Sequence, residues 1–476
     1  MALSELVPGC GLEHVSVTGL SEDSRTVVAG DAFVAVRGQT SDGHLHIGEA
    51  VRRGAAAILC ERAPADTCVP VVEVSQLSLR RGEIARRFCA DPSAELHCVG
   101  VTGTNGKTSI AHFLAQLTGL LGGRCGYLGT IGWGFLDALE PARLTTDDAI
   151  TLQKHLRVLC EGGADSVAME VSSHALSQGR VDEIAFDGAV FSNLSRDHLD
   201  YHDSFEAYGE AKARLFAWDG LTWAVVNVDD AFGAALTQRL APDVRLISYG
   251  RGGEVGWSDL RFSPDGIAGR WRTPWGDADF QLALAAEFSV ANLAAAMASA
   301  CLVGYSFADV AQAANSVSGV PGRMEFFRAA GRPTVVVDYA HTPDALDQAL
   351  AAARQHAAGR VICVFGCGGD RDVGKRPQMA LAAERAADEI WLTSDNPRSE
   401  DPLQILRDME RGLSGRVPAH RCVDRSDAVA QALDAAEDRD LIVVAGRGHE
   451  AFQEIGGQRV PLNDRDLVAG LLGVNA

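Results

Sequence analysis

The sequence predicts an α/β protein with three domains, and three observations lead to this prediction. Its 476 residues correspond to about three domains at roughly 150 residues each. Continuous apolar runs alternate with helical stretches, a pattern typical of parallel sheets covered by helices. The pattern is interrupted at Asp91-Pro92 and again at residues 319–322, GVPG. We therefore expect a small mixed α/β domain over residues 1–90, a central parallel-sheet domain over 91–320 and a C-terminal domain over 321–476.

Composition and charge exclude several classes of protein. Apolar residues make up 47% and charged residues 22%, which is ordinary for a globular chain and excludes wholesale disorder. The net charge of -20 argues against binding to nucleic acid or to an anionic membrane. The eleven cysteines are scattered and form no CxxC pair, as expected for reduced thiols in a cytoplasm. The first residues, MALSELVPGCGLEHV, lack a basic and an apolar segment, so we expect no secretory signal.

The first two domains are assigned from their strand-like runs. AFVAVRG, AAAILCE and VPVVEV precede Asp91-Pro92, whereas HCVGVTG, SVAMEVSS, GAVFSNLS and WAVVNVDD follow it. The apolar stretch from Phe288 to Tyr305 resembles a membrane span. It is rich in alanine, contains three polar side chains and directly follows Glu287, so a buried helix is the favoured interpretation.

The C-terminal domain alternates strands and helices. Its four strand-like runs are TVVVDYA, VICVFG, EIWLTS and LIVVAG, and each ends in a polar or glycine-rich segment. Open parallel sheets bind ligands outside the carboxyl ends of their strands. We therefore expect a Rossmann-like domain with a ligand site at that edge.

The strongest motif is VGVTGTNGKTS, residues 99–109. An apolar strand runs into a glycine-rich turn, and an amphipathic helix follows. Gly103 and Gly106 would let backbone N–H groups surround phosphate oxygens at a helix N-terminus. Lys107 would reach the β- and γ-phosphates, and the Thr108 hydroxyl would bind Mg²⁺. Val101 departs from the strict GxxxxGK[ST] pattern, but the mechanics are the same. The central domain is therefore predicted to be a P-loop ATP-binding domain.

Lysine is rare in this chain. Of 43 basic residues only four are lysines, namely Lys107, Lys154, Lys212 and Lys375. A retained lysine is a candidate for chemistry that a guanidinium cannot perform, although survival from a compositional bias is the alternative.

Two strand ends in the central domain carry acidic and imidazole groups. Glu170 lies in AMEVSSH and His198 in FSNLSRDHLDYH. These two residues could hold a second Mg²⁺ beside the phosphates. The alternative is that Asp197 merely caps a helix at DHLDYH.

The ordered motifs resemble those of the Mur ligase family, and specifically its diaminopimelate-adding branch. They are GTNGKT, EVSSHALSQGR, NLSRDHLDYH, EAKARLF, GRME, DYAHTPD, GCGGDRD, DNPR and GHE, and together they extend over nearly the whole chain. The resemblance implies a cytoplasmic monomer that uses ATP and Mg²⁺ in peptidoglycan synthesis. It would join meso-2,6-diaminopimelate to UDP-N-acetylmuramoyl-L-alanyl-D-glutamate (UDP-MurNAc-L-Ala-D-Glu) through an acyl phosphate. No nucleic acid partner and no membrane insertion are expected.

The resemblance also implies roles for individual residues. Lys107, Glu170, His198 and Lys212 are the expected catalytic residues, with Lys212 carbamylated by CO₂. Thr108, Glu170, His198 and the carbamate of Lys212 are the expected metal ligands. The expected ATP contacts are Gly103, Thr104, Asn105, Gly106, Lys107, Thr108, Ser109, Asn292, Arg323, Asp338 and His341. The expected UDP-MurNAc-dipeptide contacts are Ser24, Gln39, Thr40, Ser41, Thr145, Thr146, Ser172, Gln178 and Arg180. The expected diaminopimelate contacts are Arg371, Asp395, Asn396, Pro397, Arg398, Gly446 and Glu450.

Two positions depart from the family pattern. Leu144 stands where the family often has asparagine, which puts one substrate hydrogen bond of the family in doubt. Arg447 replaces the lysine of GKGHE, which suggests that this position needs only a cation.

Three alternatives stay open at this point. The chain could be a related ligase with another acceptor, such as a folylpolyglutamate-type enzyme, or a non-catalytic P-loop nucleotide-binding module. Arg398 could merely cap its turn or pair with Glu400 on the surface. Finally, the sequence does not identify the group that deprotonates the attacking amine.

Overall fold

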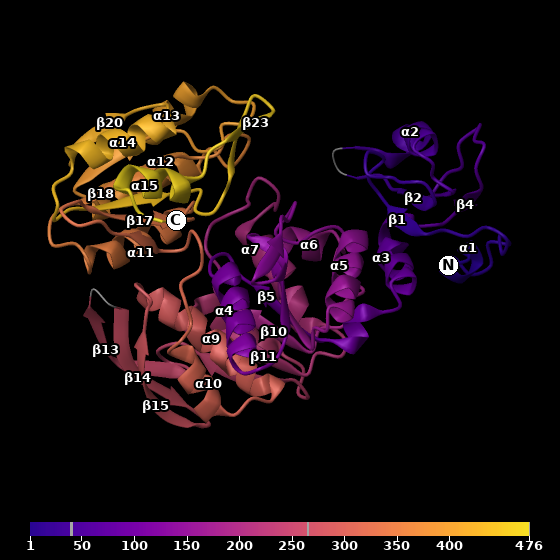
Figure 1. Cartoon of the computed structure of the whole chain (residues 1–476), viewed down its shortest axis with the longest axis horizontal. Coiled ribbons are helices and arrows are strands. Elements are labelled where there is room, and N and C mark those ends of the chain that lie inside the picture. Colours follow the sequence, from indigo (N-terminus) through magenta and orange to yellow (C-terminus); the bar gives the residue numbers. More distant parts are fainter. Residues whose placement is uncertain (39–40, 264–265, 476) are drawn as a thin grey trace. The chain divides into compact units, whose positions relative to one another are not determined.

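The structure, a computed structural model, describes residues 1–38, 41–263 and 266–475 (Figure 1). The chain forms two compact units. The first comprises residues 1–100, 123–189 and 214–222, and the second comprises 101–122, 190–213 and 223–476. The central domain contributes to both units, and the boundaries at 90 and 320 stay predictions. In the part of the chain that the structure describes, no helix is long and apolar enough to cross a membrane.

The N-terminal domain is a small parallel sheet with helices. Its strands pair in the order β1-β2-β3-β4, and all three pairs are parallel. Alternate residues of these strands enter two apolar clusters, one with Val34 and Leu59 and the other with Phe33 and Ile58. The elements are β1 (Gly19–Ser21), β2 (Asp31–Ala35), β3 (Ala57–Cys60), β4 (Val71–Glu73), α1 (Leu3–Leu6), α2 (Ile47–Arg52) and α3 (Leu77–Phe88), with short 3₁₀ turns at Gly43–His46 and Pro92–Glu95.

The central domain is built on an eight-stranded sheet of order β12-β11-β10-β5-β9-β6-β7-β8. The pairs β11–β12 and β6–β9 are parallel, whereas β6, β7 and β8 form an antiparallel meander. The apolar runs predicted as strands here become β5, β9, β10 and β11. The strands are β5 (His97–Thr102), β6 (Cys125–Gly129), β7 (Gly132–Phe135), β8 (Ala138–Glu140), β9 (Ser166–Glu170), β10 (Gly188–Phe191), β11 (Trp223–Asn227) and β12 (Arg245–Tyr249).

Helices of the central domain include the predicted buried helix. The apolar stretch from Phe288 to Tyr305 forms most of α9 (Glu287–Val303). This helix packs against α4, and most of its residues are buried. The buried-helix interpretation is therefore confirmed. The helices are α4 (Lys107–Leu120), α5 (Ala149–Glu161), α6 (Ser173–Ser177), α7 (Phe205–Ala213), α8 (Ala231–Leu236), α9 and α10 (Phe307–Ala314), with 3₁₀ turns at Arg214–Ala217 and Thr237–Arg239.

A three-stranded antiparallel sheet, which the sequence analysis did not identify, precedes α9. It consists of β13 (Gly256–Ser263), β14 (Gly266–Thr273) and β15 (Gly276–Leu282). Its inner side is apolar, with Trp271 and Phe280 in ring contact at 4.4 Å between centroids. The outer side is polar, so the strands alternate as expected for a half-buried sheet.

The C-terminal domain has the predicted doubly wound form. Its sheet has the order β16-β17-β21-β18-β19-β20, and only the β16–β17 pair is antiparallel. Figure 1 shows its helices around this sheet. Val443 and Phe365 enter a cluster with Leu346 of α11, whereas Val444 and Val364 enter a cluster with Val468 of α15. The two faces of the sheet are thus both covered, which explains why its strands are continuously apolar.

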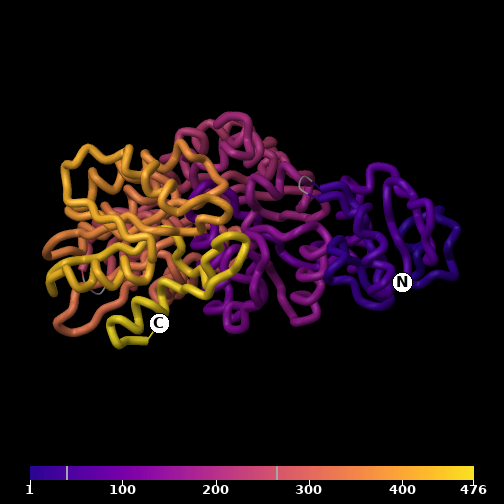
Figure 2. The backbone as a smooth tube through the Cα atoms, turned by 90° about the horizontal axis from the view of Figure 1, so that it is seen from above, coloured from indigo at the N-terminus to yellow at the C-terminus, as the bar shows by residue number. Residues whose placement is uncertain are grey.

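The C-terminal domain is the orange to yellow part of the tube in Figure 2. The strands are β16 (Glu325–Phe327), β17 (Thr334–Asp338), β18 (Val361–Phe365), β19 (Glu389–Leu392), β20 (Ala419–Arg421) and β21 (Leu441–Ala445), followed by the hairpin β22 (Phe452–Ile455) and β23 (Gln458–Pro461). The helices are α11 (Pro343–Arg354), α12 (Lys375–Ala386), α13 (Pro402–Glu410), α14 (Arg425–Ala435) and α15 (Asp464–Leu472).

Candidate active site

The glycine-rich loop lies between β5 and α4, as the sequence predicts for a phosphate-binding loop. Gly103 has a φ of 145° and Gly106 a φ of 86°, conformations that L side chains rarely adopt. A Cβ on Gly103 would lie 1.9 Å from Ser192 Oγ, and one on Gly106 would lie 2.6 Å from Asn292 Oδ1. Both positions therefore require glycine, and the loop is held between β10 and α9.

Two lysines meet at one backbone carbonyl of this loop. Lys107 Nζ donates to the carbonyl oxygens of Gly103 and Thr104, each at 2.9 Å. Lys212 Nζ donates to the same Gly103 oxygen at 2.8 Å, and its side chain is only 1% exposed. Burial, reinforced by the charge of Lys107 and partly offset by Asp197, holds the pKa of Lys212 well below its usual value. Lys212 is thus a buried lysine with a strong tendency to be neutral.

Asp197 was considered as a helix cap, and that alternative is wrong. Helix α7 begins at Phe205, and the Ser204 hydroxyl accepts from Ala207 N instead. The Asp197 carboxylate is buried and faces three cationic or imidazole groups. Its distances are 3.2 Å to Lys375 Nζ, 3.3 Å to His198 Nε2 and 3.6 Å to His341 Nε2.

These neighbours decide the charge of Asp197. Burial alone would raise its pKa, but the interactions with His341, Lys375 and His198 outweigh burial and hold the pKa well below its usual value. Asp197 is therefore a carboxylate at neutral pH. The rare Lys375, which the sequence analysis flagged without a role, is one of its partners.

The predicted ATP contacts of the second unit lie around the start of α4 and the β16–β17 edge. Arg323 donates to Thr108 Oγ1 at 3.0 Å, and its guanidinium lies 4.1 Å from the centre of the Tyr339 ring. Asp338 is buried and accepts from the backbone N–H groups of Met324 and Ala340, both at 2.7 Å. Burial raises the pKa of Asp338, although Arg323 acts against it.

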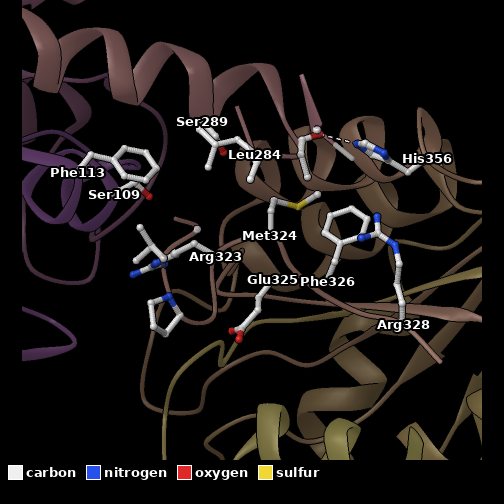
Figure 3. Close-up of a pocket in the computed structure, with 16 residues that line it drawn as sticks. Ser109, Phe113, Leu284, Ser289, Arg323, Met324, Glu325, Phe326, Arg328 and His356 are labelled. Carbon is white, nitrogen blue, oxygen red and sulfur yellow. Dashed lines mark hydrogen bonds between the residues drawn. The ribbon is translucent and has the colours of Figure 1, made fainter. Parts of the chain in front are cut away.

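A cavity of about 510 Å³ adjoins this region (Figure 3). Ser109 and Phe113 of α4 line one end, Arg328 and His356 line the other, and Arg323 and Met324 lie between them. This volume is within the range of small-molecule sites. Ser109, at one end of the cavity, directly follows the glycine-rich loop in the sequence. A nucleotide bound at the loop could therefore extend into the cavity.

In the first unit, Glu170 ends strand β9 with its carboxylate fully engaged. Tyr127 OH donates to Oε1 at 2.6 Å, Thr130 N donates to Oε1 at 2.8 Å, and Thr130 Oγ1 donates to Oε2 at 3.1 Å. A Cβ on Gly129 would lie 2.2 Å from Oε1, so glycine is needed there. Across residues 1–38, 41–263 and 266–475, no group of three or more His, Cys, Asp or Glu residues forms a ready metal site.

Four predicted muramoyl-peptide contacts lie around Glu170. The Thr145 hydroxyl lies 3.0 Å from Thr130 Oγ1 and donates to it, because the single proton of Thr130 Oγ1 goes to Glu170. Thr146 Oγ1 donates to the Glu170 carbonyl at 2.8 Å, and Ser172 N donates to Thr146 Oγ1 at 3.0 Å. Arg180 donates to the Thr146 carbonyl at 2.8 Å. The structure therefore brings these four residues together around Glu170.

Arg180 also donates from Nε to Gln178 Oε1 at 2.9 Å, so two of the predicted contacts fix each other. Arg81 of α3, which the sequence analysis missed, donates to the Gln178 carbonyl at 3.3 Å and lies 3.4 Å from Glu22. Burial, together with Asp148, raises the pKa of Glu22 to about 7, whereas Arg81 and Arg180 act against this rise.

The predicted uridine-side residues are only partly described. Ser24 Oγ donates to Glu49 at 2.8 Å, and the Ser41 hydroxyl lies 3.3 Å from His46 Nε2. Gln39 and Thr40 lie outside the described residues. Leu144, the departure from the family's asparagine, is 48% exposed.

At the carboxyl ends of β19 and β21, predicted diaminopimelate contacts meet. Asn396 Nδ2 donates to Glu450 Oε2 at 2.8 Å. Gly446 has a φ of 115°, and a Cβ on it would lie 2.6 Å from Asp395 Oδ2. Burial raises the pKa of Glu450, and the nearby charge of Asp395 raises it further. The carboxylates of Asp395 and Glu450 therefore interact at this edge of the sheet, and they are called the acidic pair below.

Arg398 and Arg371 are the two arginines predicted to contact the same ligand as this acidic pair. Arg398 NH1 donates to the Gly369 carbonyl at 2.8 Å, and its Nε lies 3.5 Å from Glu454. Pairing of Arg398 with Glu400, one of the alternatives, is wrong, because Glu400 pairs with Arg376. Its contacts to loop carbonyls do agree with a role in the turn. Arg371 NH1 lies 3.7 Å from Asp200 and is more than half exposed.

Comparison with known proteins identifies the family of this chain. Three family descriptions match: "Mur ligase family, catalytic domain" at residues 16–88, "Mur ligase middle domain" at 101–300 and "Mur ligase, glutamate ligase domain" at 322–448. The chain therefore belongs to the Mur ligase family, whose fold of three α/β domains it shares.

Two curated relatives carry the name UDP-N-acetylmuramoyl-L-alanyl-D-glutamate–2,6-diaminopimelate ligase. That of Ectopseudomonas mendocina is 48% identical over 98% of this chain and 96% of its own. That of Pseudomonas aeruginosa is 44% identical over the same shares. A solved structure with the same name is 36% identical, covers 99% of both chains and has a TM-score of 0.69. MurF of Acinetobacter baumannii, at 19% identity, covers 96% of this chain and 94% of its own with a TM-score of 0.71, and it supports the fold alone.

Proposed function

We propose that this chain is an ATP-dependent, ADP-forming ligase that adds meso-2,6-diaminopimelate to UDP-MurNAc-L-Ala-D-Glu in peptidoglycan precursor synthesis. One observation carries the proposal. The same chain contains a phosphate loop with the buried Lys212 and the acidic pair Asp395–Glu450. The relatives named above, 48% and 44% identical over 98% of the chain, carry the name of this activity. We expect the enzyme to act in the cytoplasm as a monomer.

The first chemical step would be activation of the substrate carboxylate. A carboxylate is a poor electrophile, so transfer of the γ-phosphoryl group of ATP to its oxygen would form an acyl phosphate and ADP. Catalysis of this step is mainly positioning and neutralisation of phosphate charge. The loop amides and Lys107 would perform this role, and Lys107 would exchange its two loop carbonyls for phosphate oxygens.

Lys212 would act as a carbamate rather than as an ammonium. Its neutral amine can attack CO₂, forming an N–C bond and releasing one proton. Burial and the charge of Lys107 favour the neutral form that this reaction needs. The product is an anion, which would face Lys107 at Gly103 and relieve the repulsion between the two lysines.

Magnesium fits the donors that this chain offers. Mg²⁺ prefers oxygen ligands and usually retains several waters. The Thr108 hydroxyl and the carbamate of Lys212 would supply protein oxygens, and Glu170 and His198 remain predicted ligands. The ion would neutralise phosphate charge during the transfer.

The second step would be attack by the amine of diaminopimelate on the acyl phosphate, with release of phosphate. Asp395 and Glu450 would accept from an ammonium group, and Arg398 would pair with the distal carboxylate. Pro397 would fix the turn that carries Arg398, and Arg371 remains a predicted contact. Exclusion of water would protect the acyl phosphate from hydrolysis.

The test is release of ADP from the purified chain with each acceptor omitted in turn, across a panel of amino acids. Dependence on both UDP-MurNAc-L-Ala-D-Glu and diaminopimelate supports the proposal. Turnover with another acceptor would assign a related ligase, such as a folylpolyglutamate-type enzyme. ADP release that needs no acceptor, or no release at all, would instead indicate a nucleotide-binding module.

A further inference from the structure

Arg447, which follows strand β21, is a buried cation with no assigned role. Its side chain is fully buried. We propose that Arg447 is a positioning residue that orients Asn396 and Glu450 so that one carboxylate oxygen of Glu450 faces the ammonium of the incoming amino acid. This inference rests on the proposed function, and it goes beyond the contacts expected from the family resemblance.

The guanidinium joins three separate segments of the C-terminal domain. NH1 donates to Asn396 Oδ1 at 3.0 Å and lies 3.5 Å from Glu450 Oε2. NH2 donates to the Leu462 carbonyl at 2.9 Å. These contacts are directional, so the interpretation that the position needs only a cation is incomplete.

The consequence for Asn396 is a fixed amide. Its Oδ1 accepts from Arg447 and also from Glu454 N at 2.8 Å, so two donors define which end of the amide is oxygen. The opposite end, Nδ2, must then point at Glu450, to whose Oε2 it donates at 2.8 Å.

The consequence for Glu450 is that its two oxygens become different. Asn396 and Arg447 both engage Oε2, whereas Oε1 lies 3.5 Å from the Tyr339 hydroxyl. The side chain remains 29% exposed, and Oε1 is the oxygen that neither Asn396 nor Arg447 contacts. We assign the capture of the ammonium to Oε1.

A lysine could not make the same set of contacts. Its ammonium is a compact point charge, whereas the planar guanidinium presents donors in two directions at once. Lysine at this position could serve Glu450 or the Leu462 carbonyl, but the fork that also fixes Asn396 would be lost. Arg447 is thus a feature of this chain and not an equivalent replacement for the lysine of GKGHE.

Arg425, another fully buried arginine of this domain, shows what a purely structural role looks like. It forms a two-point ion pair with Asp464, at 2.8 and 2.7 Å, which is also fully buried. Arg447 has no such matched carboxylate, and among the described residues none accepts from its Nε. Its side-chain partners, Asn396 and Glu450, are predicted ligand contacts.

Arg447 also influences the titration of Glu450. The groups whose charges or hydroxyl face Glu450 come from several elements, and they are Asp395, Arg447, His341, Arg425 and Tyr339. Asp395 raises the pKa of Glu450, whereas Arg447 and His341 lower it. Removal of the Arg447 charge therefore raises the pKa of Glu450 further, and the carboxylate is lost at a higher pH.

The test uses the full-length enzyme with Arg447→Lys and Arg447→Met. We expect KM for diaminopimelate to rise roughly 10- to 100-fold in both, as misplacement of a binding group by about 1 Å can cause. KM for ATP and for UDP-MurNAc-L-Ala-D-Glu should stay near the wild-type values. In Arg447→Met, the acid limb of kcat/KM for diaminopimelate should move to higher pH, whereas Arg447→Lys should keep it near that of wild type.

Arg360→Lys is the matched control, because Arg360 precedes β18 at the opposite end of the sheet and pairs with Asp440 and Glu389. It should lower Tm and leave KM for diaminopimelate unchanged. The inference is overturned if both Arg447 variants, shown by their Tm to be folded, retain the wild-type KM for diaminopimelate and the wild-type acid limb of kcat/KM. It is also overturned if KM rises equally for all three substrates. A wild-type enzyme that does not use diaminopimelate would overturn the proposed function instead.

Discussion

The phosphate loop and the acidic pair each bring like charges together, two lysines at the loop and two carboxylates at the pair. At the loop, Lys107 and Lys212 donate to one carbonyl, and the pKa of Lys212 is lowered. In the acidic pair, burial and the charge of Asp395 raise the pKa of Glu450. Other buried charges are matched by a charge of opposite sign, as in the pair Arg425–Asp464. Crowding of like charges is costly, so its presence marks places where a ligand of opposite charge is expected.

The largest effect is expected from Lys212→Arg, which tests the cationic side of this comparison. A guanidinium cannot be carbamylated and stays charged beside Lys107. We expect ligase activity below about a hundredth of wild type, a loss of roughly 2.7 kcal/mol or more in barrier. The measurement is ADP release, with intact mass to detect the CO₂ adduct in wild type. An active wild-type enzyme that carries an unmodified Lys212 would contradict the carbamate.

Lys107→Arg should come next. The charge is kept, but a guanidinium is larger and planar, whereas the carbonyls of Gly103 and Thr104 converge on a compact ammonium. We expect less than a tenth of wild-type turnover, roughly 1.4 kcal/mol in barrier, from steady-state ADP release. Substantial activity in this variant would argue against direct contact between Lys107 and phosphate. Lys154→Arg is the matched control, because Lys154 donates to the Leu20 carbonyl and has no predicted role in the site.

Arg398→Ala tests the anionic side of the comparison. It removes the cation that is predicted to pair with the distal carboxylate of diaminopimelate. Diaminopimelate differs from lysine by that carboxylate, so a specificity residue should lose diaminopimelate turnover selectively. We expect the preference for diaminopimelate over lysine to fall roughly 30-fold, with KM for ATP nearly unchanged. Equal losses for the two amino acids would leave Arg398 with only its turn contact to Gly369.

The smallest effect on catalysis is expected from Glu22→Gln, which examines a third like-charge pair, Glu22 and Asp148. Burial and Asp148 raise the folded-state pKa of Glu22 from 4.5 to about 7. An acid whose pKa is raised by folding binds its proton more tightly when folded, so its contribution to stability falls as pH rises from about 4.5 to about 7.

Glutamine removes this titration. The free energy of unfolding of the variant, measured relative to wild type, should therefore increase from pH 5 to pH 8 by about 2 kcal/mol. Urea unfolding at both pH values measures the difference. A gap that does not change with pH would mean that Arg81 and Arg180 already keep Glu22 ionised.

Much of the site could be read from the sequence because the signal is local. The loop glycines, the strand before them and the helix after them are contiguous, and each has one physical reason. The scarcity of lysine also identified Lys212, whose burial the structure confirms. The parallel strands were predictable because both faces are covered, which makes them continuously apolar.

Other features depend on contacts between distant residues. Asp197 and Lys375 are 178 positions apart, and nothing near either one in the sequence indicates the other. The partners of Arg447 come from residues 396, 450 and 462, so composition alone suggested only a cation. The sheet β13–β15 was missed because its strands alternate apolar and polar residues, a weaker pattern than the continuous apolar runs.

The division of the chain into interleaved units bears on its synthesis. Residues 101–122 and 190–213 belong to the second unit but are translated between segments of the first. Helix α4 is almost entirely buried, and it packs against α9, which begins at Glu287. The part of α4 that packs against α9 therefore remains uncovered while the ribosome adds more than one hundred and fifty residues. We expect truncated chains that stop before α9 to aggregate or to bind chaperones, although they contain the whole phosphate loop.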